Sequence, residues 1–145
     1  QVVWLWPNID AGSDSISKLL REFREKNKSS KIHFYRNFSA EDYISVLKNS
    51  LCIVGNSSSG IREASFMGVP SVNIGERQLG RERTPNVVDV NYDKEEIKKA
   101  ILFQANNGNY EKNFTYGDGK SGQRMANILS QIDTSRLNKK FHLVL

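Results

Sequence analysis

The chain has 145 residues, of which 38% are hydrophobic and 26% are charged, a composition typical of one soluble globular domain with room for a core. No apolar run approaches the ~20 residues of a membrane-spanning helix. The net charge of +5 permits binding of anionic ligands, but basic and acidic residues alternate along segments such as Arg21–Lys26, so the charge alone does not indicate nucleic-acid binding.

The first part of the chain predicts two strands that alternate with two helices. The apolar run at 2–6 is predicted as a buried strand, and 32–35 is predicted as a short strand. Between them, four apolar residues recur at helical spacing and predict an amphipathic helix over 14–27: Ile16, Leu19, Leu20 and Phe23. Ser39 and Asp42 resemble a helix capping box, with Phe38 and Tyr43 as its hydrophobic staple. A second helix is therefore expected to run to about residue 49.

The rest of the chain continues the alternation. Leu51–Val54 is predicted as a strand, and a helix is predicted over 59–67, where Gly68 and Pro70 stop it. Strands are also predicted at 71–74 and 86–90, on either side of a charged loop at 75–84. Two amphipathic helices follow, one opened by Asp93 and one from about residue 122, before a tail from Thr134. Their apolar faces carry Ile97, Ala100 and Ile101, and then Met125, Ile128, Leu129 and Ile132.

Alternating strands and helices, with apolar rather than half-polar strands, predict an α/β fold: a Rossmann-like parallel sheet with helices on both faces. Ligands of such sheets bind at the carboxyl ends of the strands. Polar loops follow the predicted strands at 7–13, 36–39, 55–59 and 75–84. We therefore expect these loops to meet at one edge of the sheet and to form a nucleotide site there.

The segment from Gly55 to Glu63, with the sequence GNSSSGIRE, is the most informative of these loops. A small polar loop between a strand and a helix offers free backbone N–H groups to a phosphate, and serine hydroxyls add donors. Glu63 is placed to accept hydrogen bonds from ribose hydroxyls. The alternative is structural, because Gly and Ser are common in connecting loops and Ser is a favoured N-cap. The segment is neither a GxGxxG fingerprint nor a P-loop.

Cysteine and histidine are scarce. Cys52 is the one cysteine and lies in an apolar run, which predicts a small buried hydrophobe, no disulfide and a cytoplasmic location. His33 and His142 are far apart in the sequence, so we expect no metal site and no cofactor. The chain opens as a strand, without a starting Met or a signal peptide, which favours a piece of a longer protein.

Four segments in this order carry a resemblance: Pro7–Ser13 (PNIDAGS), Gly55–Glu63, Gly75–Arg81 (GERQLGR) and Tyr116–Gly119 (YGDG). The chain resembles the C-terminal half of a UDP-N-acetylglucosamine 2-epimerase, in particular the hydrolysing branch that supplies sialic or legionaminic acid synthesis. The resemblance implies a GT-B-like enzyme with two Rossmann-like domains. Residues 1–145 then correspond to its C-terminal nucleotide-binding domain, and the N-terminal domain lies outside this chain.

The resemblance also implies roles for particular residues. Ser57 and Ser58 would bind the diphosphate, and Glu63 would hold the ribose hydroxyls. Arg77 would reach the phosphates or the sugar. Asn8 would contact the nucleotide sugar, and Phe38 would lie by the uracil, through its backbone. The region 32–39 departs most from the family pattern.

In the hydrolysing branch, UDP is lost by anti elimination after a base removes the C2 proton, and water then adds to the 2-acetamidoglucal. The resemblance places those acids and bases in the first domain and at the hinge before residue 1, so it implies no catalytic residue in this chain. The chain alone should bind nucleotide and not catalyse. The partners expected are UDP-N-acetylglucosamine or a related nucleotide sugar and UDP, with no nucleic acid or membrane, and a homo-oligomer is expected for the full-length enzyme.

Three other functions compete with this one. The nucleotide-binding half of a GT-B glycosyltransferase would share the fold, the phosphate loop and the ribose carboxylate, but it would require an acceptor. A stand-alone nucleotide-sensing or protein-interaction module and a nucleic-acid-binding protein are the others. The sequence leaves open the sugar's substituents, UDP against another nucleotide, and hydrolysing against reversible epimerisation, although Pro7–Ser13 and Gly75–Arg81 favour the hydrolysing type.

Overall fold

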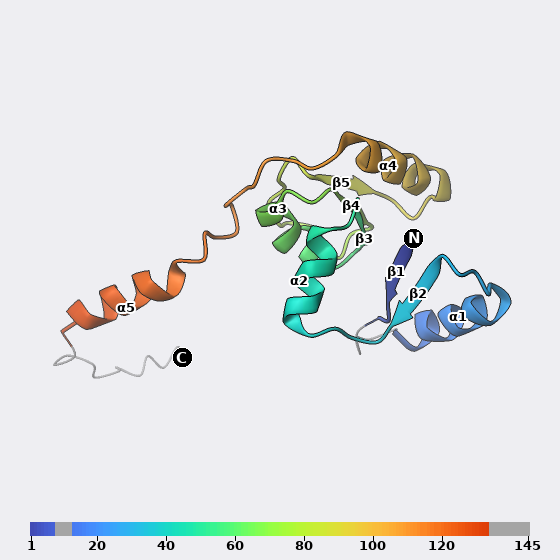
Figure 1. The fold of residues 1–145 in the computed structure, drawn as a ribbon. Coiled ribbons are helices and arrows are strands. Elements are labelled where there is room, and N and C mark those ends of the chain that lie inside the picture. Colours follow the sequence, from blue (N-terminus) through green and yellow to red (C-terminus); the bar gives the residue numbers. More distant parts are fainter. Residues whose placement is uncertain (8–12, 134–145) are drawn as a thin grey trace, which may run out of the picture. The chain divides into compact units, whose positions relative to one another are not determined.

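The computed structural model describes residues 1–7 and 13–133, and Figure 1 shows their elements. The chain divides into two compact units, residues 1–49 and 50–145. The strands of both units are parallel, which confirms the α/β class and the Rossmann-like character of the fold. The described strands form a two-stranded and a three-stranded sheet, one in each unit, where the sequence suggested one sheet.

The first unit begins with a strand–helix–strand arrangement. β1 (Val2–Leu5) pairs in parallel with β2 (Ile32–Tyr35), with Leu5 beside Tyr35, and α1 (Ser13–Lys26) connects them. The ring of Trp4 lies 5.7 Å from that of Phe23 on α1 and 5.9 Å from that of Phe34 on β2. Aromatic contact therefore holds the helix against the two strands. The prediction that the strand at 2–6 is buried is wrong, because all four residues of β1 are exposed and a two-stranded sheet leaves each strand with one unpaired edge.

The second helix of this unit, α2 (Ala40–Lys48), has the N-cap that the sequence predicted. Ser39 Oγ accepts a hydrogen bond from the Asp42 backbone N–H (3.1 Å) and donates one to the Asp42 carboxylate (2.8 Å). The ring of Phe38 lies 4.7 Å from that of Tyr35, and the staple with Tyr43 stays a prediction.

The second unit is built on a parallel sheet in the order β3-β4-β5, formed by Ile53–Gly55, Ser71–Ile74 and Val87–Val90. α4 (Lys94–Asn107) packs against β4 and β5. Its buried Gln104 donates from Nε2 to the carbonyls of Ser71 (2.9 Å) and Asn86 (2.8 Å). α4 is thus fixed to the start of both strands by one amide.

The helix predicted over 59–67 is wrong as one continuous element. The structure has a 3-10 turn, η1 (Ser58–Gly60), and then α3 (Glu63–Met67), so Glu63 begins the helix and does not lie on its second turn. The cause is the approach to β4: a Cβ on Gly60 would lie 2.6 Å from Ser71 Oγ, and Ile61 is fully buried. The tighter winding of η1 brings this backbone onto the strand.

A buried hydrogen-bond network ties α3 to the loop before β5. Ser65 Oγ contacts the Ile61 carbonyl, Thr84 Oγ1 (2.5 Å) and Asn86 Oδ1 (3.0 Å). Asn86 Nδ2 in turn donates to the Val69 carbonyl (2.8 Å). Buried polar groups that all find partners fix a single arrangement of the segments that carry them.

The last described helix, α5 (Ser121–Gln131), has no buried residue. The predicted apolar face is exposed. Its residues are Met125, Ile128, Leu129 and Ile132. No helix among residues 1–7 and 13–133 is both long and apolar enough to cross a membrane.

Candidate functional site

The loop that follows β3 presents unpaired donors. Ser57 is the N-cap of η1: its Oγ accepts the Ser59 N–H (3.3 Å), and its carbonyl accepts the Gly60 N–H (3.2 Å). Within the described part of the chain, the backbone N–H groups of Ser57 and Ser58 donate to no other group. Two adjacent free N–H groups in a tight turn can bind an anion.

The break in the predicted helix changes how this turn could bind an anion. α3 has five residues, so its macrodipole is small, and the dipole contribution expected from a longer helix is largely lost. Individual N–H groups of the turn, together with neighbouring side chains, would therefore carry the binding. Ser57 is exposed and Ser58 half-buried, so both can be reached from solvent.

The loop that follows β4 lies against this turn. Two side chains donate to the Asn56 carbonyl: Arg77 from Nη1 (3.0 Å) and Gln78 from Nε2 (2.7 Å). The loops after neighbouring parallel strands thus meet at one edge of the sheet in this unit, as the sequence predicted for 55–59 and 75–84. Arg77 is exposed, and its guanidinium is held beside the turn that carries Ser57 and Ser58.

Arg83 braces the same loop. Its guanidinium donates to the Asp89 carboxylate (2.8 Å), to the Arg81 carbonyl (2.8 Å) and to the Gln78 carbonyl (3.0 Å). Asn73 of β4 donates to the other Asp89 oxygen (2.6 Å). The loop is therefore connected to both β4 and β5, which gives the Arg77 side chain a fixed base.

The hydrogen bonds of Asp89 with Arg83 and Asn73 can be tested through the pH dependence of stability. Partial burial opposes the shift, but hydrogen bonds from Arg83 and Asn73 lower the pKa of Asp89 below its ordinary 3.8. A lowered folded-state pKa contributes stability above the unfolded value, and the contribution is lost as pH falls through the folded value. We expect Asp89→Asn to cost about 0.5–1 kcal/mol of unfolding free energy at neutral pH, a figure reduced for its exposure.

The measurement is urea unfolding of wild type and Asp89→Asn at neutral pH and in acid below 3.8, the ordinary aspartate pKa. The two proteins should converge in acid. Glu111→Gln is the matched control, because this exposed carboxylate has no hydrogen-bond or ion-pair partner among the described residues. A difference between wild type and Asp89→Asn that persists undiminished in acid would contradict the brace.

Glu63 carries an unpaired acceptor. The side chain is half-buried at the start of α3, and its Oε2 is buried with no hydrogen-bond partner in the described part of the chain. A carboxylate oxygen removed from water without a donor is costly. The sequence predicted a ribose-binding role for Glu63, and two vicinal hydroxyls would supply the donors that Oε2 lacks.

The other two predicted binding residues belong to the first unit. Asn8 lies outside the described residues. Phe38 is half-buried, and its backbone N–H donates to Asn37 Oδ1 (2.9 Å), so the backbone contact expected with uracil would involve its carbonyl or replace that bond. The roles of all six residues remain predictions: Asn8, Phe38, Ser57, Ser58, Glu63 and Arg77.

Four residues at this edge were missed by sequence reasoning: Asn56, Gln78, Arg83 and Asp89. They act through contacts between segments that are distant along the chain, such as the 22 positions that separate Asn56 from Gln78. Asn56 and Gln78 do lie within segments that carry the family resemblance.

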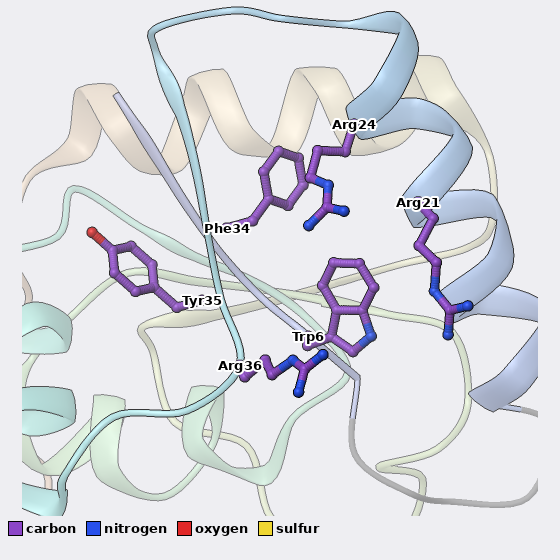
Figure 2. Close-up of a pocket in the computed structure, with 6 residues that line it drawn as sticks. All are labelled: Trp6, Arg21, Arg24, Phe34, Tyr35 and Arg36. Atoms are coloured by element: carbon purple, nitrogen blue, oxygen red, sulfur yellow. The ribbon is translucent and has the colours of Figure 1, made fainter.

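The first unit contains a cationic pocket of about 390 Å³. Figure 2 shows three guanidinium groups around the indole of Trp6, while the ring of Tyr35 points away. Arg24 lies over the Trp6 ring, 5.6 Å from its centroid. None of the described residues that line it carries a carboxylate, so this part of the lining suits an anionic group. Its residues are Trp6, Arg21, Arg24, Phe34, Tyr35 and Arg36.

Two further observations concern possible metal ligands and the cysteine. Among the described residues, no group of three His, Cys, Asp or Glu side chains could hold a metal ion. Burial raises the pKa of the Cys52 thiol to about 11, against the opposing effect of a backbone hydrogen bond. The thiol is therefore protonated at physiological pH and a poor nucleophile.

Comparison with known proteins identifies the family. The family model described as UDP-N-acetylglucosamine 2-epimerase matches residues 1–130. The chain belongs to this family. The matched residues include both loops described above.

The chain is similar to three relatives of known name. UDP-N-acetylglucosamine 2-epimerase of Neisseria meningitidis is 31% identical over 136 residues, covering 92% of this chain and 35% of the relative. The hydrolysing UDP-N,N'-diacetylbacillosamine 2-epimerase of Legionella pneumophila is 33% identical over 132 residues (91% and 34%). Polysialic acid biosynthesis protein P7 of Escherichia coli is 36% identical over 99 residues (68% and 25%). The chain spans about a third of the length of the first two.

Proposed function

We propose that this chain is the UDP-binding part of a hydrolysing UDP-N-acetylglucosamine 2-epimerase, which converts UDP-N-acetylglucosamine or a close relative to N-acetylmannosamine and UDP. Membership of the family supports the reaction class. The hydrolysing type is supported by the printed name of the Legionella relative and by the segments Pro7–Ser13 and Gly75–Arg81. A role of the product in sialic acid synthesis is supported by the name of the Escherichia coli relative.

The observation that carries nucleotide binding is the pairing of unmet donors with an unmet acceptor at one sheet edge. The free N–H groups of Ser57 and Ser58 suit a diphosphate, with the guanidinium of Arg77 beside them. The buried Oε2 of Glu63 suits a ribose hydroxyl. Phosphate donors and a ribose acceptor on adjacent turns match the order of groups in a nucleoside diphosphate.

The same groups would assist the reaction by stabilising its leaving group. Elimination transfers negative charge onto the diphosphate as the C1–O bond breaks. Fixed N–H groups and a guanidinium aimed at that oxygen cluster lower the barrier, because they need no reorganisation as the charge develops. We propose that the acid and base groups belong to the part of the enzyme outside this chain, so that these residues bind nucleotide without turnover.

One preparation of the chain tests both halves of this proposal. Chemical-shift changes on adding UDP should cluster at residues 55–63 and 75–83. Incubation with UDP-N-acetylglucosamine should release no N-acetylmannosamine. Shifts confined to other residues would overturn the site. Measurable turnover would overturn the proposal that the acid and base groups lie outside this chain. The candidate bases would then be Asp10, Glu63, Glu76 and Glu82.

A further inference from the structure

Gln78 is an anomaly in its loop. Its neighbours Glu76, Arg77 and Leu79 are exposed, yet Gln78 is only 2% exposed. Its Oε1 is buried and has no hydrogen-bond partner among the residues that the structure describes. An apolar side chain would fill the same space without leaving an acceptor unpaired. A buried amide whose oxygen is unpaired suggests that its Nε2 group has a specific role.

The Nε2 group of Gln78 contacts the turn at 56–58, which the proposed function assigns to phosphate binding. Gln78 Nε2 donates to the Asn56 carbonyl at 2.7 Å, which is the shorter of the two hydrogen bonds to that oxygen. The peptide that carries this carbonyl also carries the Ser57 N–H. No peptide bond in the described residues is cis, and in a trans peptide the C=O and N–H point in opposite directions. Fixing the Asn56 carbonyl therefore fixes the direction of the Ser57 N–H.

Gln78 is itself held from the sheet. Its backbone carbonyl accepts a hydrogen bond from Arg83 (3.0 Å), which is paired with Asp89 of β5 (2.8 Å). The connection runs from β5 through Arg83 and Gln78 to the turn at Asn56. Donors that are oriented before the ligand arrives bind it without the cost of ordering a loop.

We propose that Gln78 is a positioning residue that orients the phosphate-binding turn at 56–58, and that it acts on the diphosphate of the ligand and not on the nucleoside. This inference rests on the proposed function. It predicts that Gln78 affects only ligands with phosphate groups, whereas Glu63, which faces the ribose in that proposal, affects ligands with or without them.

The test compares UDP with uridine by calorimetry or NMR titration of the full chain. Gln78→Met keeps the length of the side chain and removes the donor. We expect it to weaken UDP binding about tenfold, the equivalent of one hydrogen bond to an oriented donor, and to leave uridine binding within about twofold. Glu63→Gln should weaken both ligands.

Gln104→Met is the matched control. Gln104 is an equally buried glutamine whose amide also donates to backbone carbonyls, those of Ser71 and Asn86, but it lies in the core and not against the turn. It should lower stability without changing the ratio of UDP to uridine affinity. If Gln78→Met does not fold, Arg83→Lys is the second variant, because it retains the glutamine and weakens the hydrogen bond to the Gln78 carbonyl. It should show the same selective loss of UDP affinity, but a smaller one.

The outcomes separate the two proposals. Equal losses for UDP and uridine, no loss for either, or a Gln78→Met effect that matches Gln104→Met would overturn the positioning role and leave nucleotide binding intact. A wild-type chain that binds UDP no better than uridine would overturn the diphosphate site and this inference with it.

Discussion

Replacing Glu63 with Gln is expected to weaken UDP binding by about 1.5–3 kcal/mol, because the substitution keeps the shape of the side chain and removes the charge-assisted hydrogen bonds that the proposed function assigns to Glu63 and the ribose hydroxyls. Isothermal titration calorimetry measures the change. Deoxyuridine diphosphate provides the second arm: it should bind wild type more weakly than UDP does, and it should bind the variant about as well as UDP does.

The free energy of unfolding of Glu63→Gln distinguishes a binding role from a structural role. Glu63 Oε2 is buried without a partner in the described part of the chain, so removal of the charge should not lower the free energy of unfolding. Loss of affinity without loss of stability would identify a binding group. Glu76→Gln is the control, since this exposed carboxylate lies in the neighbouring loop. Unchanged UDP affinity in Glu63→Gln would leave Glu63 as a residue without a role in nucleotide binding.

The parts of the fold that sequence predicted well depend on local signals. Ser39 caps α2 because a serine before a helix satisfies a free N–H within three residues. Gly68 ends α3 with φ at 74°, a conformation that glycine adopts without strain. The apolar runs form parallel strands, with some ends shifted by one or two residues, although β1 is exposed where a buried strand was predicted. Each of these features is decided within a few positions of the residue that signals it.

The parts that sequence missed depend on contacts across the fold. The helical pattern of 59–67 gave no sign of the break at Ile61 and Arg62, because the approach of Gly60 to Ser71 decides it. Gln78 looked like one polar residue among several, and only its contact with Asn56 distinguishes it. The candidate site is predicted by the places of the loops after strands and by the family resemblance, whereas the hydrogen bonds of Arg83 and Gln78 behind those loops are visible only in the structure.

Replacing Gly68 with Ala is expected to lower the stability of the second unit by about 2–4 kcal/mol, the largest stability effect we predict. Two terms add. An L-residue at φ 74° is strained, and the new Cβ would lie 2.1 Å from the Tyr110 carbonyl oxygen, a backbone atom that cannot rotate away. The contact is integral to the unit, because the Tyr110 N–H donates to the Gly68 carbonyl (2.8 Å) and the Asn113 N–H to that of Ser65 (2.9 Å).

Two further glycines separate these terms. Gly80 has a similar φ of 78° but open space around its Cβ position, so Gly80→Ala should show the strain alone, about 1 kcal/mol. Gly122 has open space and no positive φ, so Gly122→Ala in α5 should be neutral or slightly stabilising. Both tryptophans, Trp4 and Trp6, belong to the first unit, so their fluorescence does not report on the second. Hydrogen exchange at the Val72 and Ile74 amides of β4 is the appropriate measurement, and equal losses in Gly68→Ala and Gly80→Ala would show that the segment at Tyr110 yields to the added methyl group.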